Sequence, residues 1–148
     1  MARVAAVLAL LLMPYAAEAA ISAGCSDLGL DEALEQANAQ GGGDILITCP
    51  SDTTIYLRKA KHFEQPGTYS ISSVGPGLVV LDARGLSRHF MLGDTGHNKG
   101  LRADGFQLTL RKLSLRNGFA TAVQTKKGTV QGGGCIYVGT LGKLYLEV

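Results

Sequence analysis

The chain has 148 residues, of which 46% are hydrophobic, with 20 glycines and no tryptophan. This length fits one domain, and the composition suits many short strands joined by tight turns better than helices packed around large aromatic side chains. The formal net charge of +2 is too small to indicate a nucleic-acid partner, and no cluster of basic and aromatic residues offers a binding platform for one. The sequence therefore argues against nucleic-acid binding.

Residues 1–19 have the pattern of a secretory signal peptide. Arg3 precedes an apolar run from Val4 to Met13, and a small-residue site that ends at Ala19 follows, so we predict cleavage after Ala19. A membrane anchor is the less favoured alternative, because the run is too short to cross a bilayer comfortably. No later stretch is apolar for long enough to span a membrane once the signal is removed. We therefore expect a secreted or cell-surface protein.

The cysteines agree with export. A disulfide between Cys25 and Cys49 would close a loop of about 25 residues and contribute about 3 kcal/mol if unstrained. Two unpaired thiols remain the alternative. Cys135 is the odd one out, either a small apolar filler or a residue whose partner lies beyond the given sequence.

Residues 20–49 are predicted to form an N-terminal cap made of a helix and a first strand. Four apolar residues recur with helical spacing, namely Leu30, Ala33, Leu34 and Ala37. Asp31 is placed to cap this helix or to favour its positive end, and the glycines at 41–43 stop it. The strand at 44–49 follows directly and ends at Pro50. Such a helix would cover the open end of a stack of strands.

Residues 50–148 show short strands separated by turns. We predict strands at 54–57, 68–72, 78–81, 87–92, 106–110, 113–115, 134–138 and 143–147, with loops at 93–104 and 119–131. The alternation of apolar residues slips by one position at Arg111 and Lys112, which indicates a corner between two strands. Neither residue readily adopts positive φ, so we expect the chain to bend into another sheet without reversing.

The order of motifs predicts which strands lie side by side. Phe90, Leu113 and Ile136 are spaced by 23 residues each, which alone would stack them. The order of neighbouring segments indicates a different arrangement. The segment around Phe90 and the segment around Ile136 are each followed by a glycine-containing loop and then by a strand in which apolar and polar residues alternate. We therefore expect Ile136 beside Phe90, the strand at 144–146 beside that at 106–110, and Leu113 on a third face. Three faces per turn indicate an all-β parallel β-helix, a solenoid that the N-terminal helix caps.

Several of these segments carry a family resemblance. The relevant stretches are Val79 to Asp82, Ser87 to Phe90, Leu108 to Leu110, Leu113 to Gly118, Gly132 to Tyr137 and Leu144 to Leu146. They resemble the N-terminal part of secreted right-handed parallel β-helix proteins of the pectin lyase-like superfamily. The likeness is greatest to the repeats of chlamydial polymorphic outer-membrane proteins, which alternate a Gly-Gly-Ala-Ile element with a Phe-x-x-Asn element.

The resemblance is partial. Residues 133–136 match the first element with Cys135 in place of alanine, and Asn117 supplies the asparagine of the second element without its phenylalanine. The resemblance implies a right-handed coil and a non-catalytic, adhesin-like surface protein. The same superfamily holds polysaccharide lyases and hydrolases, so an enzyme remains the alternative.

No catalytic, cofactor-binding or metal-binding residue is predicted. Polysaccharide hydrolysis needs two carboxylates that face one cleft, and lyase chemistry needs a base beside a cation site of several acidic oxygens. The acids of residues 78–148 are Asp82, Asp94, Asp104 and Glu147, and none lies two residues from another on a strand face. Asp82, Asp94 and Asp104 are better explained as turn formers. The histidines His62, His89 and His97 lack the spacing of metal ligands and are expected at the surface.

The leading hypothesis is an exported, non-catalytic surface protein that binds carbohydrate or a cell-surface partner through the loops at 93–104 and 119–131. The alternatives are the N-terminal part of a polysaccharide lyase or glycoside hydrolase, and a structural cell-surface spacer. The last alternating strand, 143–147, has nothing polar to cover it, so it is expected to leave an open sheet edge. We therefore expect that the chain is the N-terminal part of a longer protein, truncated at its C-terminus.

Overall fold

The structure is a computed structural model that describes residues 19–93, 105–120, 123–125, 128–130, 134–139 and 142–147. The predicted signal peptide lies outside the described residues except for Ala19, and so does most of the loop at 93–104. The described residues form one helix and a series of short strands: β1 (Ile21–Ala23), α1 (Asp27–Gln40), β2 (Gly42–Ile47), β3 (Thr53–Tyr56), β4 (Lys61–Phe63), β5 (Gly67–Ser73), β6 (Val79–Asp82), β7 (Phe90–Leu92), β8 (Phe106–Arg111), β9 (Leu113–Arg116), β10 (Val123–Thr125), β11 (Gly128–Val130), β12 (Ile136–Val138) and β13 (Lys143–Glu147).

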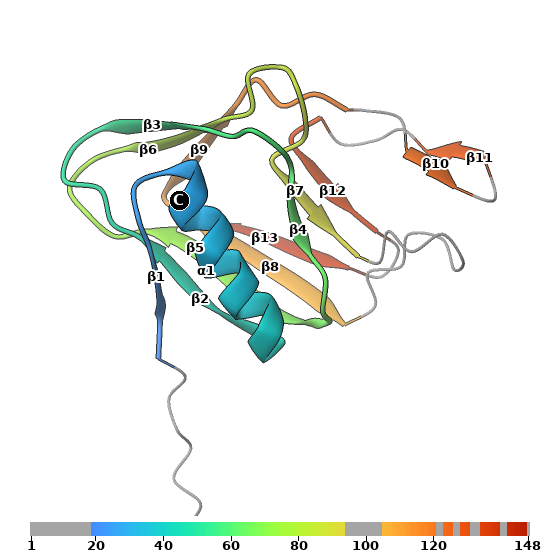
Figure 1. The fold of residues 1–148 in the computed structure, drawn as a ribbon, viewed down its shortest axis with the longest axis horizontal. Helices are drawn as coiled ribbons and strands as arrows, with labels where there is room; N and C mark the ends of the chain where they lie inside the picture. Colours follow the sequence, from blue (N-terminus) through green and yellow to red (C-terminus); the bar gives the residue numbers. More distant parts are fainter. Residues whose placement is uncertain are drawn as a thin grey trace, which may run out of the picture.

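Most strands pair in parallel, in three small sheets that surround a common core (Figure 1). The largest sheet has the order β1-β2-β5-β8-β13, the second β4-β7-β12 and the third β3-β6-β9. β10 and β11 form a separate antiparallel pair. Segments far apart in the sequence therefore lie side by side, and the chain moves from one sheet to another at each corner.

The predicted register between distant strands is confirmed. Ile136 pairs with Phe90, and Leu144 pairs with Leu108. Leu113 instead pairs with Val79 in the third sheet. The regular spacing of 23 residues therefore does not stack the three residues on one another.

The predicted fold class, an all-β right-handed parallel β-helix, is wrong. The capping helix was part of the prediction, and the 14-residue helix α1 does pack its apolar face into the core, so the difference lies in the strands. The strands divide into three small sheets and an antiparallel pair, and the described residues form no closed or solenoid sheet. The reason lies at the corners, where Arg84, Lys112 and Asn117 adopt φ angles of 57°, 52° and 55°. This left-handed conformation ends the ladder of one strand before the next begins. The corner after Arg111 is confirmed, but the expectation that Lys112 avoids positive φ is wrong.

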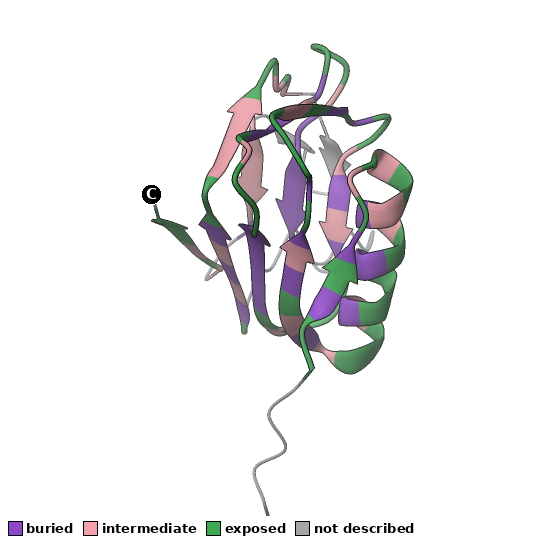
Figure 2. Ribbon diagram, turned by 90° about the vertical axis from the view of Figure 1, so that its left-hand side faces the viewer, coloured by how far each residue is buried: buried purple, intermediate pink, exposed green. Residues whose placement is uncertain are grey.

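Helix α1 covers one end of the core. Its buried residues are the four predicted ones, Leu30, Ala33, Leu34 and Ala37, and it packs against β1, β2 and β4. The helix begins earlier than predicted, because the Ser26 side chain accepts a hydrogen bond of 3.0 Å from the Gly29 N–H and so caps the first turn. It ends at Gly41, whose φ of 74° suits a glycine. Figure 2 shows α1 at one end of the stacked strands and the C-terminal strand at the other.

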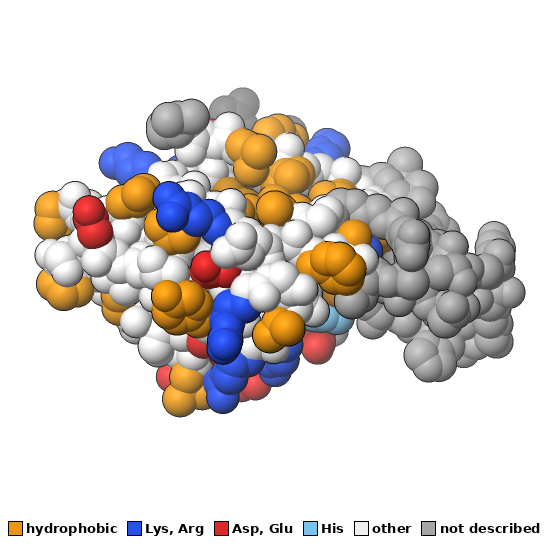
Figure 3. Space-filling model, turned by 90° about the horizontal axis from the view of Figure 1, so that it is seen from above, with side chains coloured by type: hydrophobic (Ala, Val, Ile, Leu, Met, Phe, Trp, Pro, Cys, Tyr) orange, Lys and Arg blue, Asp and Glu red, His pale blue; other side chains and the backbone are white. Residues whose placement is uncertain are grey.

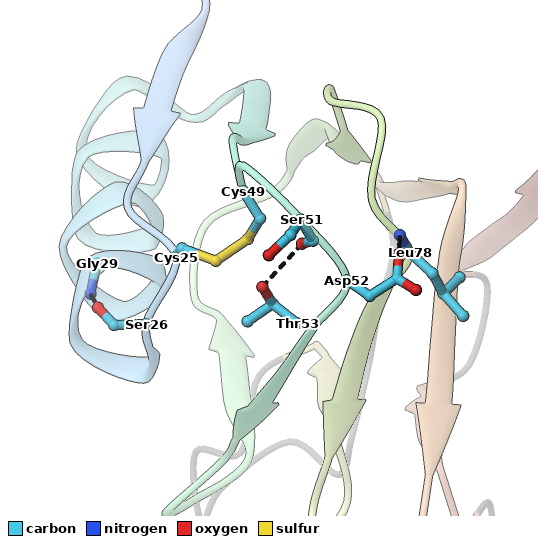
Figure 4. Close-up of a disulfide and its surroundings, with 8 residues drawn as sticks. All are labelled: Cys25, Ser26, Gly29, Cys49, Ser51, Asp52, Thr53 and Leu78. Atoms are coloured by element: carbon cyan, nitrogen blue, oxygen red, sulfur yellow. Dashed lines mark hydrogen bonds between the residues drawn. A yellow bond between two sulfur atoms is a disulfide. The ribbon is translucent and has the colours of Figure 1, made fainter.

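The predicted disulfide is confirmed. Cys25 and Cys49 are bonded, with their Cα atoms 5.3 Å apart, and Figure 4 shows the bond joining the start of α1 to the segment after β2. Close by, the Asp52 carboxylate accepts a hydrogen bond of 2.8 Å from the Leu78 N–H and so links the approaches to β3 and β6. The disulfide therefore fixes the covering helix to the strands that it covers.

Four strands are not predicted from the sequence, namely β1, β4, β10 and β11. β4 contains Lys61 and His62, which do not suggest a strand, yet Lys61 pairs with Phe90 and is 1% exposed. β1 lies directly after the predicted signal cleavage site and pairs in parallel with β2. Both strands form only because other segments supply their partners.

Candidate binding surface

The three sheets together have two ends, and these ends differ in what covers their outermost strands. At one end lie β1, β4 and β3, and α1 packs over β1 and β4. At the other end each sheet finishes in a strand with a single hydrogen-bonded neighbour, and these strands are β9, β12 and β13. We call this second end the open end, because no described residue pairs with the outer edges of these three strands. Unpaired backbone N–H and C=O groups along such edges are a template for pairing with another strand.

An apolar hollow of about 690 Å³ lies at the open end. Its walls come from five strands, β5, β8, β9, β12 and β13, and from the connection between β5 and β6. Its apolar lining includes Leu110, Leu113, Leu115, Ile136 and Leu146. The size is within the range of protein binding sites, which run from about 300 to about 1,000 Å³. Figure 3 shows hydrophobic side chains gathered near the upper edge of the view, the edge away from α1.

The side chains around the hollow occupy positions that would be core positions if another strand covered them. Leu144 and Leu146 are in register with Leu108 and Leu110, which are buried, so all four lie on the core-facing side of the sheet. Leu146 is nevertheless 67% exposed. The core therefore reaches the open end with its apolar side chains still in contact with water.

The rim of the hollow is charged. Lys112 and Glu147 line it. The Arg111 guanidinium donates a hydrogen bond of 2.7 Å to a Glu147 carboxylate oxygen, and this bond holds the pKa of Glu147 below its usual range. Lys143 and Glu147 lie at opposite ends of β13. An apolar centre with charges at its rim is the usual anatomy of a surface that binds another polypeptide.

The opposite end shows how this protein closes a strand edge. Asn38 of α1 donates from its side-chain amide to the His62 carbonyl at 3.1 Å and accepts from the Glu64 N–H at 3.0 Å. One side chain thus satisfies two backbone groups at the edge of β4. Leu30 and Ala37 of the same helix are completely buried against the strands. No comparable cover exists at the open end among the described residues.

A smaller polar groove of about 340 Å³ runs between α1 and β4 and is the second candidate. It brings together side chains that are distant in the sequence, among them Asp31, Glu35, Lys59, His62 and Glu64. Burial lowers the pKa of His62, which favours its neutral form. Asn38 also lines the groove, but its side chain is already hydrogen-bonded to the backbone of His62 and Glu64. Among the described residues, no three of the groove's carboxylate and histidine side chains are arranged so that they could hold a metal ion.

Asp82 and Asn117, both singled out in the sequence, are hydrogen-bonded to each other. The Asp82 carboxylate accepts from the Arg84 N–H at 2.7 Å, which confirms the predicted turn, and it also accepts from the Asn117 side-chain amide at 3.0 and 3.1 Å. The bond from the Arg84 N–H, helped by Asn117, lowers the pKa of Asp82. Asn117 lies at the corner after β9, and its side-chain amide thus links this corner to Asp82. Asp94 and Asp104 lie outside the described residues.

The expectation that the histidines lie at the surface is wrong for His89. His89 is completely buried, not exposed, and its Nε2 lies 2.8 Å from the Leu81 carbonyl oxygen. Its Nδ1 has no hydrogen-bond partner among the described residues. His62 is half-buried in the polar groove, and His97 lies outside the described residues. Cys135 is a free cysteine that lines the apolar hollow.

Much of the surface predicted for binding is not described. The loop at 93–104 lies outside the described residues except for Gly93, and the loop at 119–131 is described only at residues 119–120, 123–125 and 128–130. The described backbone of the second loop forms the antiparallel pair β10 and β11. In the part of the chain that is described, no helix is long and apolar enough to cross a bilayer.

Comparisons with known proteins give no match: no protein-family model fits the sequence, and neither a curated protein nor a solved structure resembles it significantly. The inference of function therefore depends on the site itself. The leucines and Ile136 of the hollow were not singled out from the sequence as binding residues. The signal that could have identified them is the alternation of Leu144 and Leu146 in β13, a strand whose outer edge has no partner among the described residues.

Proposed function

We propose that this protein is an exported, non-catalytic binding module that takes up an extended polypeptide segment at its open end. The observation that carries the proposal is the apolar hollow bordered by the unpaired edges of β9, β12 and β13. An added strand would hydrogen-bond to such an edge, and its alternate side chains would fill the hollow. Affinity would come from the backbone pairing and specificity from the fit of these side chains.

The chemistry of the hollow favours a polypeptide strand over carbohydrate. Its described lining contains leucine, isoleucine, proline and glycine but no aromatic side chain on which a sugar ring could stack. Its two charged residues, Lys112 and Glu147, lie at the rim. A strand with alternating apolar residues matches this surface better than a hydroxyl-rich ligand does.

Export is part of the proposal. The pattern at residues 1–19 supports it, and so does the disulfide between Cys25 and Cys49, because such bonds persist in oxidising compartments outside the cytosol. Expression of the full chain in a secreting host should release a mature protein whose N-terminal sequence begins at Ala20. Retention inside the cell with an intact N-terminus would contradict export.

Peptide binding tests the function. The probe is a fluorescently labelled peptide that copies residues 106–111 (FQLTLR), which alternates apolar and polar residues as an added strand should. Its fluorescence anisotropy should rise on titration with the mature protein. A control peptide with Thr109→Pro at its centre should bind more weakly, because proline cannot donate a ladder hydrogen bond.

Two matched variants locate the binding site. Leu146 and Leu86 are similarly exposed, at 67% and 61%, but only Leu146 lines the hollow. Leu146→Asp should abolish peptide binding, and Leu86→Asp should leave it unchanged. Equal loss in both variants would contradict the proposal, and so would the absence of any rise in anisotropy at protein concentrations at which the chain is a monomer.

The enzyme alternative has its own test. Incubation of the mature protein with pectin should produce neither unsaturated products nor new reducing ends. Formation of either product would show polysaccharide cleavage and contradict a purely binding role.

A further inference from the structure

Strand β13 is the longest of the three strands that have an unpaired edge at the open end. Its five residues, Lys143–Glu147, are all described and pair along their whole length with β8. The side facing away from β8 has no strand beside it among the described residues. This edge can therefore accept a strand of the same length.

The sequence of β13 is complementary to itself when a second β13 lies antiparallel to it. With Tyr145 opposite Tyr145 of the second copy, Lys143 faces Glu147 and Leu144 faces Leu146, each of these pairs occurring twice. Opposite charges and apolar residues that face each other across antiparallel strands stabilise the pairing. We propose that the occupant of the open end is a second copy of this chain, bound through antiparallel pairing of β13 with β13. This inference rests on the proposed function, because it names the strand that the open end takes up.

The same pairing covers the apolar surface. Leu144 and Leu146 lie on the core-facing side of β13, whereas Lys143, Tyr145 and Glu147 lie on the other side. Antiparallel pairing about a two-fold axis keeps the core-facing sides of both copies on the same side of the joined sheet. The leucines of each copy thus meet at the mouths of the two hollows. Glu147 would lie between Arg111 of its own chain and Lys143 of the second copy.

The alternating pattern also selects the register. A slip of one residue would place the leucines of one copy opposite the outward side chains of the other and would lose the apolar contact. A slip of two residues would keep the sides correct but leave the terminal charges without their opposite partners. The centred pairing is isologous and closes on itself, so it predicts a dimer and not a growing filament.

Charge reversal is the first test, with the mass of the mature protein in solution measured by light scattering after size-exclusion chromatography. The unmodified protein should be a dimer. Lys143→Glu and Glu147→Lys should each weaken dimerisation at least about tenfold, since two facing pairs change from attraction to repulsion. An equimolar mixture of the two variants should form a heterodimer, because each Lys143→Glu chain then faces a Glu147→Lys chain with opposite charges restored. Monomers of both variants that fail to combine would overturn the proposal.

Disulfide trapping tests the register. In a Cys135→Ser background, Tyr145→Cys should form a covalent dimer, because facing residues of antiparallel strands have Cα atoms about 4.5 to 5.5 Å apart, within the reach of a disulfide. Lys143→Cys in the same background should not, since each residue 143 would lie about 13 Å from its counterpart. Equal cross-linking of both variants would overturn the centred register.

The two proposals fail in different ways. If the unmodified protein is a monomer and Tyr145→Cys does not cross-link, while the labelled peptide still binds, then the open end takes up a strand other than a second copy. If the peptide does not bind and the protein is a monomer, then the open end is not a binding surface. A dimer trapped only by Tyr145→Cys and restored only by the mixed charge variants supports the inference.

Discussion

The ammonium group of Lys61 lies 2.7 Å from a carboxylate oxygen of Asp31, and the Lys61 side chain is completely shielded from water. Lys61 occupies a core-facing position of β4, in register with Phe90, and its stem runs beneath α1. Its ammonium group also donates to the Asp27 carboxylate in the first turn of the helix. A buried cation thus holds the first two turns of α1 onto the sheets.

Removal of this cation should destabilise the protein strongly. Lys61→Met keeps most of the side-chain volume but leaves two largely buried carboxylates without their shared cation, which should lower the free energy of unfolding by about 3 kcal/mol. Chemical denaturation followed by circular dichroism measures the change. Lys59→Met is the matched control, because Lys59 is 72% exposed and lies 4.0 Å from Asp31. It should change stability by less than about 1 kcal/mol, and equal effects of the two substitutions would contradict the assignment.

The same cluster should make the protein sensitive to acid. Burial opposes ionisation of Asp27, but the bonds from Lys61 and Arg58 outweigh it and hold the pKa of this carboxyl below its usual range. The folded state therefore binds the proton less readily than the unfolded state does, whose aspartate pKa is about 3.9. This contribution to stability is present above about pH 4 and is lost as the pH falls through the lower folded pKa.

Thermal unfolding at a series of pH values measures this dependence. The melting temperature should fall more steeply below about pH 4 in the unmodified protein than in Asp27→Asn, whose side chain has no carboxyl to protonate. Asp27→Asn should be the less stable protein at neutral pH. Parallel curves for the two proteins in the acid range would contradict the role of Asp27.

Sequence reasoning succeeded where a signal is local or repeated. The spacing of Leu30, Ala33, Leu34 and Ala37 predicts the helix without any knowledge of its partners. The succession of motifs around Phe90 and Ile136 predicts their pairing, because similar segments recur in the same order. Cys25 and Cys49 flank the predicted helix and first strand, and this position was enough to predict the disulfide between them.

Prediction from the sequence failed where the role of a residue depends on partners that are distant in the sequence. Lys61 lies 30 residues after Asp31, and nothing in the neighbouring sequence indicates that a lysine will be buried beneath a helix. Likewise, Lys112 is not a residue type that favours positive φ, yet the corner between two sheets imposes it. The fold class was wrong for the same reason, since local alternation predicts strands but does not determine how the corners divide them into sheets.

Loss of the disulfide should loosen the helix-covered end. Cys25→Ser together with Cys49→Ser removes a link across a sequence separation of 24 residues, which should lower the free energy of unfolding by about 3 kcal/mol. Hydrogen exchange should show the loss of protection first in α1, because the link joins its start to the strands. Cys135→Ser is the control, since Cys135 is free and should change stability far less. An unchanged exchange rate in α1 would contradict this role of the disulfide.

A close backbone approach at Gly67 gives the last prediction. A Cβ atom placed on Gly67, the first residue of β5, would lie 1.8 Å from the Gly41 carbonyl oxygen at the end of α1. The neighbour is backbone and cannot rotate away, so Gly67→Ala must shift either the helix end or the strand. Forced repacking of this kind costs about 1 to 3 kcal/mol.

Gly24→Ala is the matched control for this contact. A Cβ atom on Gly24 meets nothing closer than the Gly29 Cα at 4.0 Å, and the residue does not need positive φ. Alanine there restricts the unfolded chain and should stabilise the protein slightly, by up to about 1 kcal/mol. The melting temperature should therefore fall in Gly67→Ala and stay the same or rise in Gly24→Ala. If Gly67→Ala melts as high as Gly24→Ala, the end of α1 does not press against the start of β5, and the helix covers its end of the core less closely than described.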